Sequence, residues 1–445
     1  MNTSICDFVR NYAAENALRL HMPGHKGITL LGCENLDITE IQGADSLYEA
    51  QGIIKESELN ASLLFGCDTF YSTEGSSQCI RAMLYLVTLY AKETGRKPLI
   101  YAGRNAHKTF ITACALIDFQ IQWLYPRDDE SYLSCTVDTQ ELDEILSSAQ
   151  EKPAAVYLTS PDYLGNVADI QGISKVCKKH GVLLIVDNAH GAYLRFLESS
   201  QHPIDLGADM CCDSAHKTLP VLTGGAYLHI SPDAPRLFAE RAKSALSLFG
   251  STSPSYLILQ SLDMANKYIA KGYTDKLAEF IPLIQKVKAS LTEKGYTLVG
   301  AEELKITIST KPYGYTGYAL ADILQKENIV CEFTDPDFLV LMLTPENTQA
   351  ELARLTQVLC SITAQSPVTT LPPAFHTPEQ VMTVREAMFS ASETINTTDS
   401  IGRILASTSV GCPPAVPLIA CGERIDKHTA ECFAYYGITA CTVIK

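Results

Sequence analysis

The stretch AAVYLTSPDYLGNVADIQGISKVCKKHGVLLIVDNAHG, residues 154–191, decides the fold class. Residues 154–160 form a continuous apolar run of strand length, and residues 170–181 have helical periodicity and end in glycine. Residues 182–191 then return to an apolar strand. Two apolar strands joined by a helix indicate a mainly parallel sheet with helices on both faces, so we predict an α/β fold. Functional groups are expected at the carboxyl ends of its strands.

The chain has 445 residues, and chains beyond about 250–300 residues split into several domains. Alternating apolar runs and helical patterns predict one large domain, with shorter segments on either side. The expected boundaries are 1–45 for an N-terminal helix and arm, 46–272 for the large domain, 273–364 for a small αβ domain, and 365–445 for a Pro/Thr-rich linker and a C-terminal domain.

The expected small domain has three apolar runs of strand length, at residues 304–310, 329–333 and 337–343. A helical pattern over residues 316–328 separates the first two runs, and a second helical pattern follows the last. Thr344 is the expected N-cap of that second helix, because a threonine hydroxyl accepts a hydrogen bond from the first helical turn.

Composition excludes several classes of function. The net charge is −15 and the chain has no Lys/Arg run, so a nucleic-acid partner is not expected. No uncharged apolar run reaches the roughly 18 residues of a membrane span, and the N-terminus lacks the apolar core of a signal peptide. The fifteen cysteines include no Cys-x-x-Cys pair, so we expect no metal site and free thiols in a reducing cytoplasm.

Two segments place anion-binding or flat polar groups beside predicted strands. Gly75, Ser76 and Ser77 precede a long apolar helix, where backbone N–H groups and two hydroxyls can hold a phosphate. His107 follows the apolar run at residues 99–103 and could lie over a flat cofactor. Taken singly, the serines are equally explained as an ordinary helix cap, and the histidine as a core side chain.

Two further segments carry a carboxylate and an amine. Asp187 lies near the end of a buried strand, where a carboxylate is costly unless it is paired. Lys217 follows another predicted strand, and its neighbours Ser214 and His216 can donate hydrogen bonds to an anion. Each residue alone is also explained by a capped helix start.

Together the four segments describe a pyridoxal 5′-phosphate (PLP) site. Lys217 would form the Schiff base, and Asp187 would keep the pyridine nitrogen protonated so that the ring accepts electrons. Gly75, Ser76 and Ser77, with Ser214 and His216, would bind the phosphate.

With these residues in view, the chain resembles the ornithine/lysine/arginine decarboxylases of the aspartate-aminotransferase fold, which is PLP fold type I. The resemblance covers nearly the whole chain. Within the family, the chain resembles the compact group that lacks an N-terminal wing. It rests on residues 20–27 (LHMPGHKG), 103–109 (GRNAHKT), 159–170, 186–196, 214–228, 251–263, 385–390, 401–406 and 412–425 (CPPAVPLIACGERI).

The resemblance implies a homodimer or higher homo-oligomer in which PLP is the cofactor and a basic amino acid loses CO2. The implied catalytic residues are Lys217, His107 and Asp187, with His107 stacked on the ring. The implied cofactor-binding residues are Gly75, Ser76, Ser77, His107, Asp187, His190, Ser214, His216 and Lys217, with Thr252 and Ser253 supplied to the neighbouring subunit. Tyr163 and Glu423 are the implied substrate residues.

Three positions depart from the family pattern and bear on the substrate. Asn188 stands where the family often has glutamate, Tyr193 replaces a common histidine, and the phosphate loop reads EGSS. Arginine is the favoured substrate, with lysine and ornithine open. The same groups serve other PLP chemistry, so a lyase, an aminotransferase or a non-catalytic PLP-binding homologue remain alternatives.

Overall fold

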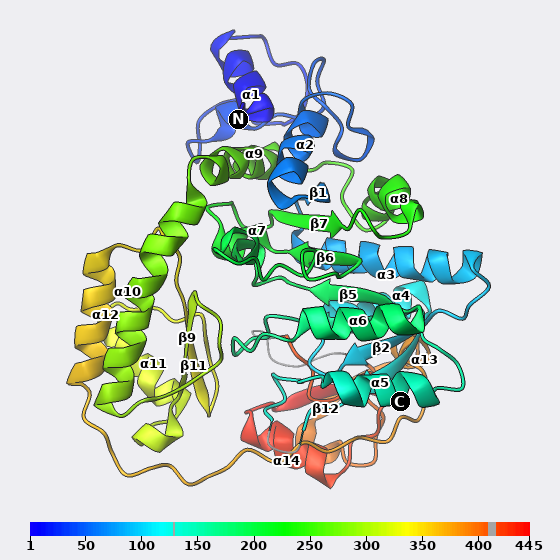
Figure 1. Cartoon of the computed structure of the whole chain (residues 1–445), viewed down its shortest axis with the longest axis vertical. Helices are drawn as coiled ribbons and strands as arrows, with labels where there is room; N and C mark the ends of the chain where they lie inside the picture. The colour runs from blue at the N-terminus through cyan, green and yellow to red at the C-terminus, as the bar shows by residue number, and fades with distance from the viewer. Residues whose placement is uncertain (128–129, 408–414) are drawn as a thin grey trace. The chain divides into compact units, whose positions relative to one another are not determined.

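The computed structural model describes residues 1–127, 130–407 and 415–445 (Figure 1). Its largest feature is a seven-stranded sheet with the strand order β1-β7-β6-β5-β4-β2-β3. The strands are β1 (Asp68–Ser72), β2 (Leu99–Gly103), β3 (Gln120–Leu124), β4 (Ala155–Thr159), β5 (Leu183–Asp187), β6 (Met210–Asp213) and β7 (Ala226–Ile230). The neighbouring pairs β5/β6 and β2/β3 are parallel, whereas β7 is antiparallel to both β6 and β1.

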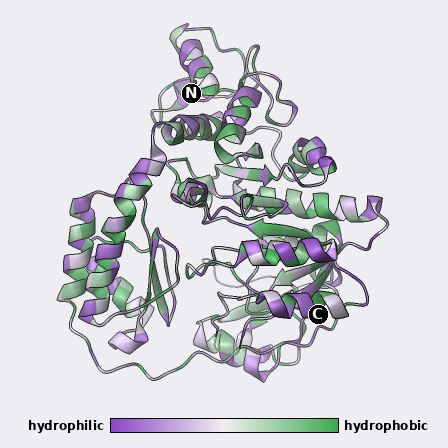
Figure 2. Ribbon diagram, in the orientation of Figure 1, coloured by the Kyte–Doolittle hydropathy of each residue, from purple (hydrophilic) through white to green (hydrophobic). Residues whose placement is uncertain are grey.

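The stretch that decided the fold class forms the predicted strand–helix–strand unit. All five residues of β5 are buried, and α6 (Ile170–His180) buries Ile170, Ile173, Ser174 and Cys177 on one face. Lys178, Lys179 and His180 lie in the last turn of α6, where positive charge is favourable. Figure 2 shows this division of hydropathy, with apolar residues along the sheet strands and polar ones on the outer face of α6. The α/β prediction is therefore confirmed.

The chain separates into two compact units. Unit 1 comprises residues 1–98, 152–156 and 170–275, and unit 2 comprises residues 99–151, 157–169 and 276–445. In unit 1, α1 (Ser4–Ala14), α2 (Ile53–Phe65) and α9 (Tyr256–Ala270) pack against one another, and α3 (Gly75–Glu93) packs against α8 (Arg236–Ser247). Before its C-terminal segment, unit 2 contains the helices α4 (Lys108–Ile117), α5 (Thr139–Ser148), α10 (Tyr273–Lys294), α11 (Gly317–Lys326) and α12 (Gln349–Ser361). The first three residues of α10 are assigned to unit 1.

A four-stranded antiparallel sheet in unit 2 has the order β10-β11-β9-β8. Its strands are β8 (Thr297–Val299), β9 (Lys305–Ser309), β10 (Phe333–Thr334) and β11 (Phe338–Met342). The strand predicted at residues 329–333 is wrong in extent, since only Phe333 and Thr334 pair with β11. Val330 is 88% exposed, so part of this apolar run lies outside the core at the edge of the sheet.

The predicted cap of the last helix of this region is also wrong. Thr348, not Thr344, is the N-cap of α12, because its side chain accepts the N–H of Glu351 at 3.2 Å. The Glu351 carboxylate accepts the backbone N–H of Thr348 in return, which completes a capping box. Thr344 begins the preceding turn, where its carbonyl accepts the N–H of Asn347 at 2.9 Å.

The C-terminal segment of unit 2 has a small core of its own. Its elements are α13 (Val384–Met388), β12 (Ser392–Asn396), α14 (Lys427–Tyr435) and β13 (Ala440–Ile444), and β12 pairs antiparallel with β13. The core residues are Leu405, Ile419, Ile425, Phe433, Cys441 and Val443. In the described parts of the chain, no helix is both long and apolar enough to cross a membrane.

Candidate active site

The carboxyl ends of β5 and β6 carry the central residues of the predicted site. These strands are parallel neighbours, so Asp187, which ends β5, lies one strand away from the segment that follows β6. Asp187 is 2% exposed, and its Oδ1 accepts the backbone N–H of Ala189 at 3.2 Å. The thiol of Cys212 lies 3.7 Å from the same oxygen. The carboxylate is thus held at the sheet edge where ligands of α/β folds bind.

Lys217 lies in the short helix α7 (Ala215–Thr218), directly after β6. Its Nζ is 2.8 Å from Nε2 of His190, which follows β5. His216, on the same helix, has its Nδ1 3.0 Å from the carbonyl oxygen of Gly225. Because a carbonyl only accepts, His216 carries a proton on Nδ1.

The predicted phosphate-binding residues open α3. The sequence led us to expect Ser76 and Ser77 before this helix. Helix α3 instead begins at Gly75, so both serines lie in its first turn. Gly75 has φ +72°, a left-handed conformation that glycine adopts without strain. The hydroxyls of Ser76 and Ser214 are 2.8 Å apart, which joins the start of α3 to the segment after β6.

The donor set in unit 1 fits PLP. A helix start with the Ser76 and Ser214 hydroxyls suits a phosphate, the buried Asp187 carboxylate suits a protonated ring nitrogen, and Lys217 supplies a primary amine. Thr252 and Ser253 are exposed residues just before α9, where the N–H of Ser253 is donated to the Ser251 hydroxyl at 3.1 Å. Their exposure is compatible with a role toward a second subunit.

Three of the predicted site residues belong to unit 2. His107 is the N-cap of α4, and its Nδ1 accepts the N–H of Thr109 at 3.2 Å, so a neutral ring carries its proton on Nε2. Tyr163 donates its hydroxyl to a carboxylate oxygen of Glu332 at 3.1 Å. These residues lie on different segments of the unit.

Glu423, the third of these residues, is occupied by a cation from its own unit. Its Oε2 lies 2.9 Å from the Arg104 guanidinium and accepts the N–H of Ala420 at 2.6 Å. Burial raises the pKa of Glu423, and the charge of Arg104 opposes that rise. Residues 412–414 of the family segment around Glu423 lie outside the described residues.

The sequence did not reveal a buried polar network behind the strand ends. We call it the strand-end network; its members are Asn188, His202, Asp213 and His229. Asp213 ends β6, and one of its oxygens accepts the Asn188 amide at 2.7 Å while the other faces Nε2 of His202 at 3.2 Å and of His229 at 3.1 Å. The only sequence signal is a carboxylate in an apolar strand, which requires partners but does not name them.

Burial and nearby charges shift the pKa values of this network. Burial lowers the pKa of His229, whose Nε2 lies 3.1 Å from an oxygen of Asp213 and whose Nδ1 lies 2.9 Å from the Thr69 hydroxyl. Burial alone would raise the pKa of Asp213, but the two histidine rings and their hydrogen bonds hold it below its usual range. The network therefore retains an ionised carboxylate.

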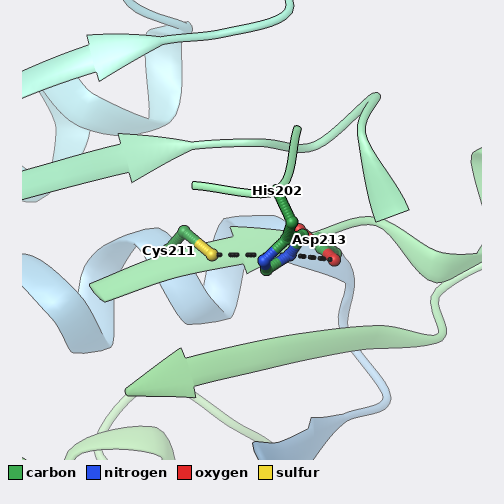
Figure 3. Close-up of side chains that lie close together, drawn as sticks. All are labelled: His202, Cys211 and Asp213. Carbon is green, nitrogen blue, oxygen red and sulfur yellow. Dashed lines mark hydrogen bonds and ion pairs between the residues drawn. The ribbon is translucent and has the colours of Figure 1, made fainter. Parts of the chain in front are cut away.

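Two members of the network, His202 and Asp213, form a trio with the neighbouring Cys211 whose metal-ligand chemistry the cysteine spacing did not predict. The ligand atoms of His202, Cys211 and Asp213 lie within 4.8 Å of one another, and all three residues are buried. Figure 3 shows the ring of His202 between the thiol and the carboxylate, with Cys211 Sγ 3.8 Å from Nε2. Burial raises the pKa of Cys211 well above its ordinary value, which disfavours the thiolate that a metal requires. Hydrogen bonding accounts for this trio.

Comparison with known families agrees with the fold. A family model described as Orn/Lys/Arg decarboxylase, major domain, matches residues 4–310, and a model of the family's C-terminal domain matches residues 363–442. The chain belongs to the Orn/Lys/Arg decarboxylase family. The resemblance inferred from the sequence is thereby confirmed, and so is the class, an amino acid decarboxylase.

Individual relatives cover most of this chain. The protein YaaO of Bacillus subtilis is 29% identical over 97% of this chain and 93% of its own length. An arginine decarboxylase of Halalkalibacterium halodurans is 29% identical over 94% of this chain and 89% of its own. The lysine decarboxylase LdcF of Francisella novicida has a similar fold, with a TM-score of 0.79 at 17% identity over 100% of this chain and 81% of that one.

Proposed function

We propose that this protein is a PLP-dependent decarboxylase that releases CO2 from arginine, with lysine and ornithine as alternative substrates. The observation that carries the proposal is the 2.8 Å contact between Lys217 Nζ and His190 Nε2, one strand away from the buried Asp187. The near-full-length similarity to an arginine decarboxylase supports arginine. The many free cysteines support a reducing, cytoplasmic setting.

Each residue of the site has a distinct task in this proposal. The first turn of α3, with the hydroxyls of Ser76, Ser77 and Ser214, would bind the phosphate of the cofactor. Asp187 would accept a hydrogen bond from the protonated ring nitrogen, and its burial strengthens that interaction. His107 would stack on the ring, as the family resemblance implies.

When bound, PLP supplies a ring that accepts the electrons left behind as CO2 departs. Lys217 would hold the cofactor between turnovers and return a proton to the α-carbon after CO2 has left. Because His190 Nε2 lies within hydrogen-bond distance of Lys217 Nζ, a proton can pass between these two atoms. His190 would thereby keep the amine in the protonation state that each step needs.

The test is CO2 release from PLP-loaded protein offered arginine, lysine and ornithine separately. The Lys217→Ala variant should release none, and Lys294→Ala, which removes an exposed lysine at the end of α10, should behave as wild type. Release from arginine alone supports the whole proposal. Release only from lysine or ornithine would overturn arginine as the proposed substrate. No release from any of the three amino acids would overturn the decarboxylase proposal in favour of a lyase or aminotransferase.

The dimer is a separate part of the proposal. Thr252 and Ser253 are exposed, and we propose that they bind the phosphate in a partner subunit's site. A Thr252→Ala/Ser253→Ala double variant should be weakly active by itself. If subunits share sites, mixing it with Lys217→Ala before refolding should restore activity, because each mixed dimer contains one intact site. Failure of the mixture to exceed its separate components, in mixtures shown to contain mixed dimers, would contradict the shared site.

A further inference from the structure

The turn that carries His107 is held by the C-terminal segment of its own unit. This turn, residues 104–107, joins β2 to α4. Backbone hydrogen bonds fix its start, since Arg104 donates its N–H to Leu124 at 2.9 Å. The Arg104 side chain is only 3% exposed, so its charge must be satisfied from within the protein.

The partners of the Arg104 guanidinium come from residues 415–423 and from β3. It donates to the carbonyl of Pro417 at 3.2 Å and to the Glu423 carboxylate at 2.9 Å. Its planar group also lies over the Trp123 ring, 5.0 Å from the ring centroid. Glu423 is 1% exposed, so the two charges form a fully buried ion pair.

A second contact follows immediately after His107. The backbone N–H of Lys108, the first residue of α4, is donated to the carbonyl oxygen of Ala415 at 2.8 Å. N–H groups in the first turn of a helix have no partner within the helix, so this carbonyl satisfies one of them. The C-terminal segment therefore holds the chain three residues before His107 and one residue after it.

We propose that Glu423 is a positioning residue that acts through Arg104 to fix the His107 turn, and so couples the C-terminal segment to the active site. The role of His107 rests on the proposed function. This assignment replaces substrate binding as the task expected for Glu423. The physical reason is that removing the carboxylate leaves a buried guanidinium without a counter-charge, and such a group relaxes by moving its backbone or admitting water.

The test compares the buried ion pair of Glu423 with an exposed ion pair of Glu379. Glu423→Gln removes the buried charge with little change of shape. Glu379→Gln is the matched control, since Glu379 pairs with Arg424 at 2.7 Å but is 66% exposed. Hydrogen exchange of amides 104–110 is the main readout, because it reports the turn whether or not the protein decarboxylates anything. We expect exchange there to accelerate by about tenfold in Glu423→Gln and to be unchanged in Glu379→Gln.

Kinetics of the PLP-loaded protein separate positioning from substrate binding. The proposal predicts that Glu423→Gln lowers kcat with little change in KM, and adds no further loss in a His107→Phe background. A higher KM with unchanged kcat and unchanged exchange would overturn it in favour of substrate binding. Unchanged exchange at residues 104–110 with a lower unfolding midpoint would leave only a structural role and also overturn it. If Glu423→Gln does not fold, Arg104→Lys tests the same exchange.

Discussion

Each unit contains a buried polar cluster, and the two differ in how well their carboxylates are satisfied. The strand-end network of unit 1 gives Asp213 three donors. The Lys311 cluster of unit 2 consists of Lys311, Asp335, Asp337 and Tyr435. There Asp337 Oδ1 lies 2.7 Å from both Lys311 Nζ and the Tyr435 hydroxyl, whereas Asp335 accepts two backbone N–H groups on one oxygen only.

The difference shows that the arrangement of donors, more than burial itself, decides whether an acid stays ionised. Asp213 and Asp335 are both buried, at 0% and 3% exposed. The pKa of Asp213 is held below its usual range. Burial raises the pKa of Asp335 to about 6, since its Oδ2 has no partner among the described residues and Asp337 lies nearby. A neutral acid is the cheaper state where donors are missing.

The largest effect is expected from breaking the better-satisfied cluster. Asp213→Asn should lower the free energy of unfolding by about 3 kcal/mol or more. The new amide would point its NH2 group at the Asn188 amide or at the two histidine rings, which are themselves the donors to Asp213. The folded pKa of Asp213 is depressed, so its contribution is present above the unfolded value near 3.9 and is lost as pH falls below it. The unfolding midpoints of the wild type and of Asp213→Asn, measured at pH 7 and at pH 3, check this, and their difference should be smaller at pH 3. Asp68→Asn, at an exposed position of β1, is the control and should have little effect.

The second effect comes from removing the cation of the other cluster. Lys311→Met leaves Asp337 with the Tyr435 hydroxyl as its remaining side-chain donor, and should destabilise unit 2 by about 2–3 kcal/mol. Chemical denaturation with hydrogen exchange of β9 and β11 measures it. Lys326→Met, at the exposed end of α11, is the matched control. Equal stability of the two variants would contradict the importance of the pair.

The third prediction sharpens the contrast between the two acids through pH. Because the folded pKa of Asp335 is raised to about 6, its stabilising contribution is complete below about pH 4 and is lost as pH rises through 6. Asp335→Asn keeps the acceptor for the N–H groups of Asp337 and Phe338. Relative to wild type, it should gain up to about 2 kcal/mol between pH 4 and pH 8. Parallel unfolding profiles over that range would refute the raised pKa.

The smallest effect is expected from an exposed pair of hydrogen bonds, the capping box of α12, whose contribution to stability can be compared with those of the two buried clusters. Thr348→Ala removes the hydroxyl of the α12 capping box and should cost about 1 kcal/mol. Thr344→Ala, four residues earlier, should cost less, because the Thr344 hydroxyl accepts the N–H of Glu346 only at 3.4 Å, in the turn that precedes α12. Calorimetry of the two variants decides between them, and a larger loss for Thr344→Ala would contradict the assigned cap.

Sequence patterns were reliable where the signal was local. The predicted β4 and α6 lie within one residue of their observed bounds, because burial on both faces and helical periodicity are written into consecutive residues. The strand predicted at residues 182–191 begins within one residue of β5, but β5 ends at Asp187, four residues before the predicted end. The predictions of a cap at Thr344 and of a strand over residues 329–333 were wrong because the local signal was ambiguous at both places. Two threonines compete to start α12, and an apolar run at a sheet edge has one neighbouring strand rather than two.

The sequence by itself determined the α/β class, the place of Asp187 at the end of β5 and of Lys217 shortly after β6, and the family. Tertiary structure alone decided that Asp213 meets Asn188, His202 and His229, and that Glu423 is paired with Arg104. The physical reason is range. Strand, helix and turn preferences act over a few neighbouring residues, whereas a buried charge takes its partners from segments 11 to 319 positions away, which only the folded chain brings together.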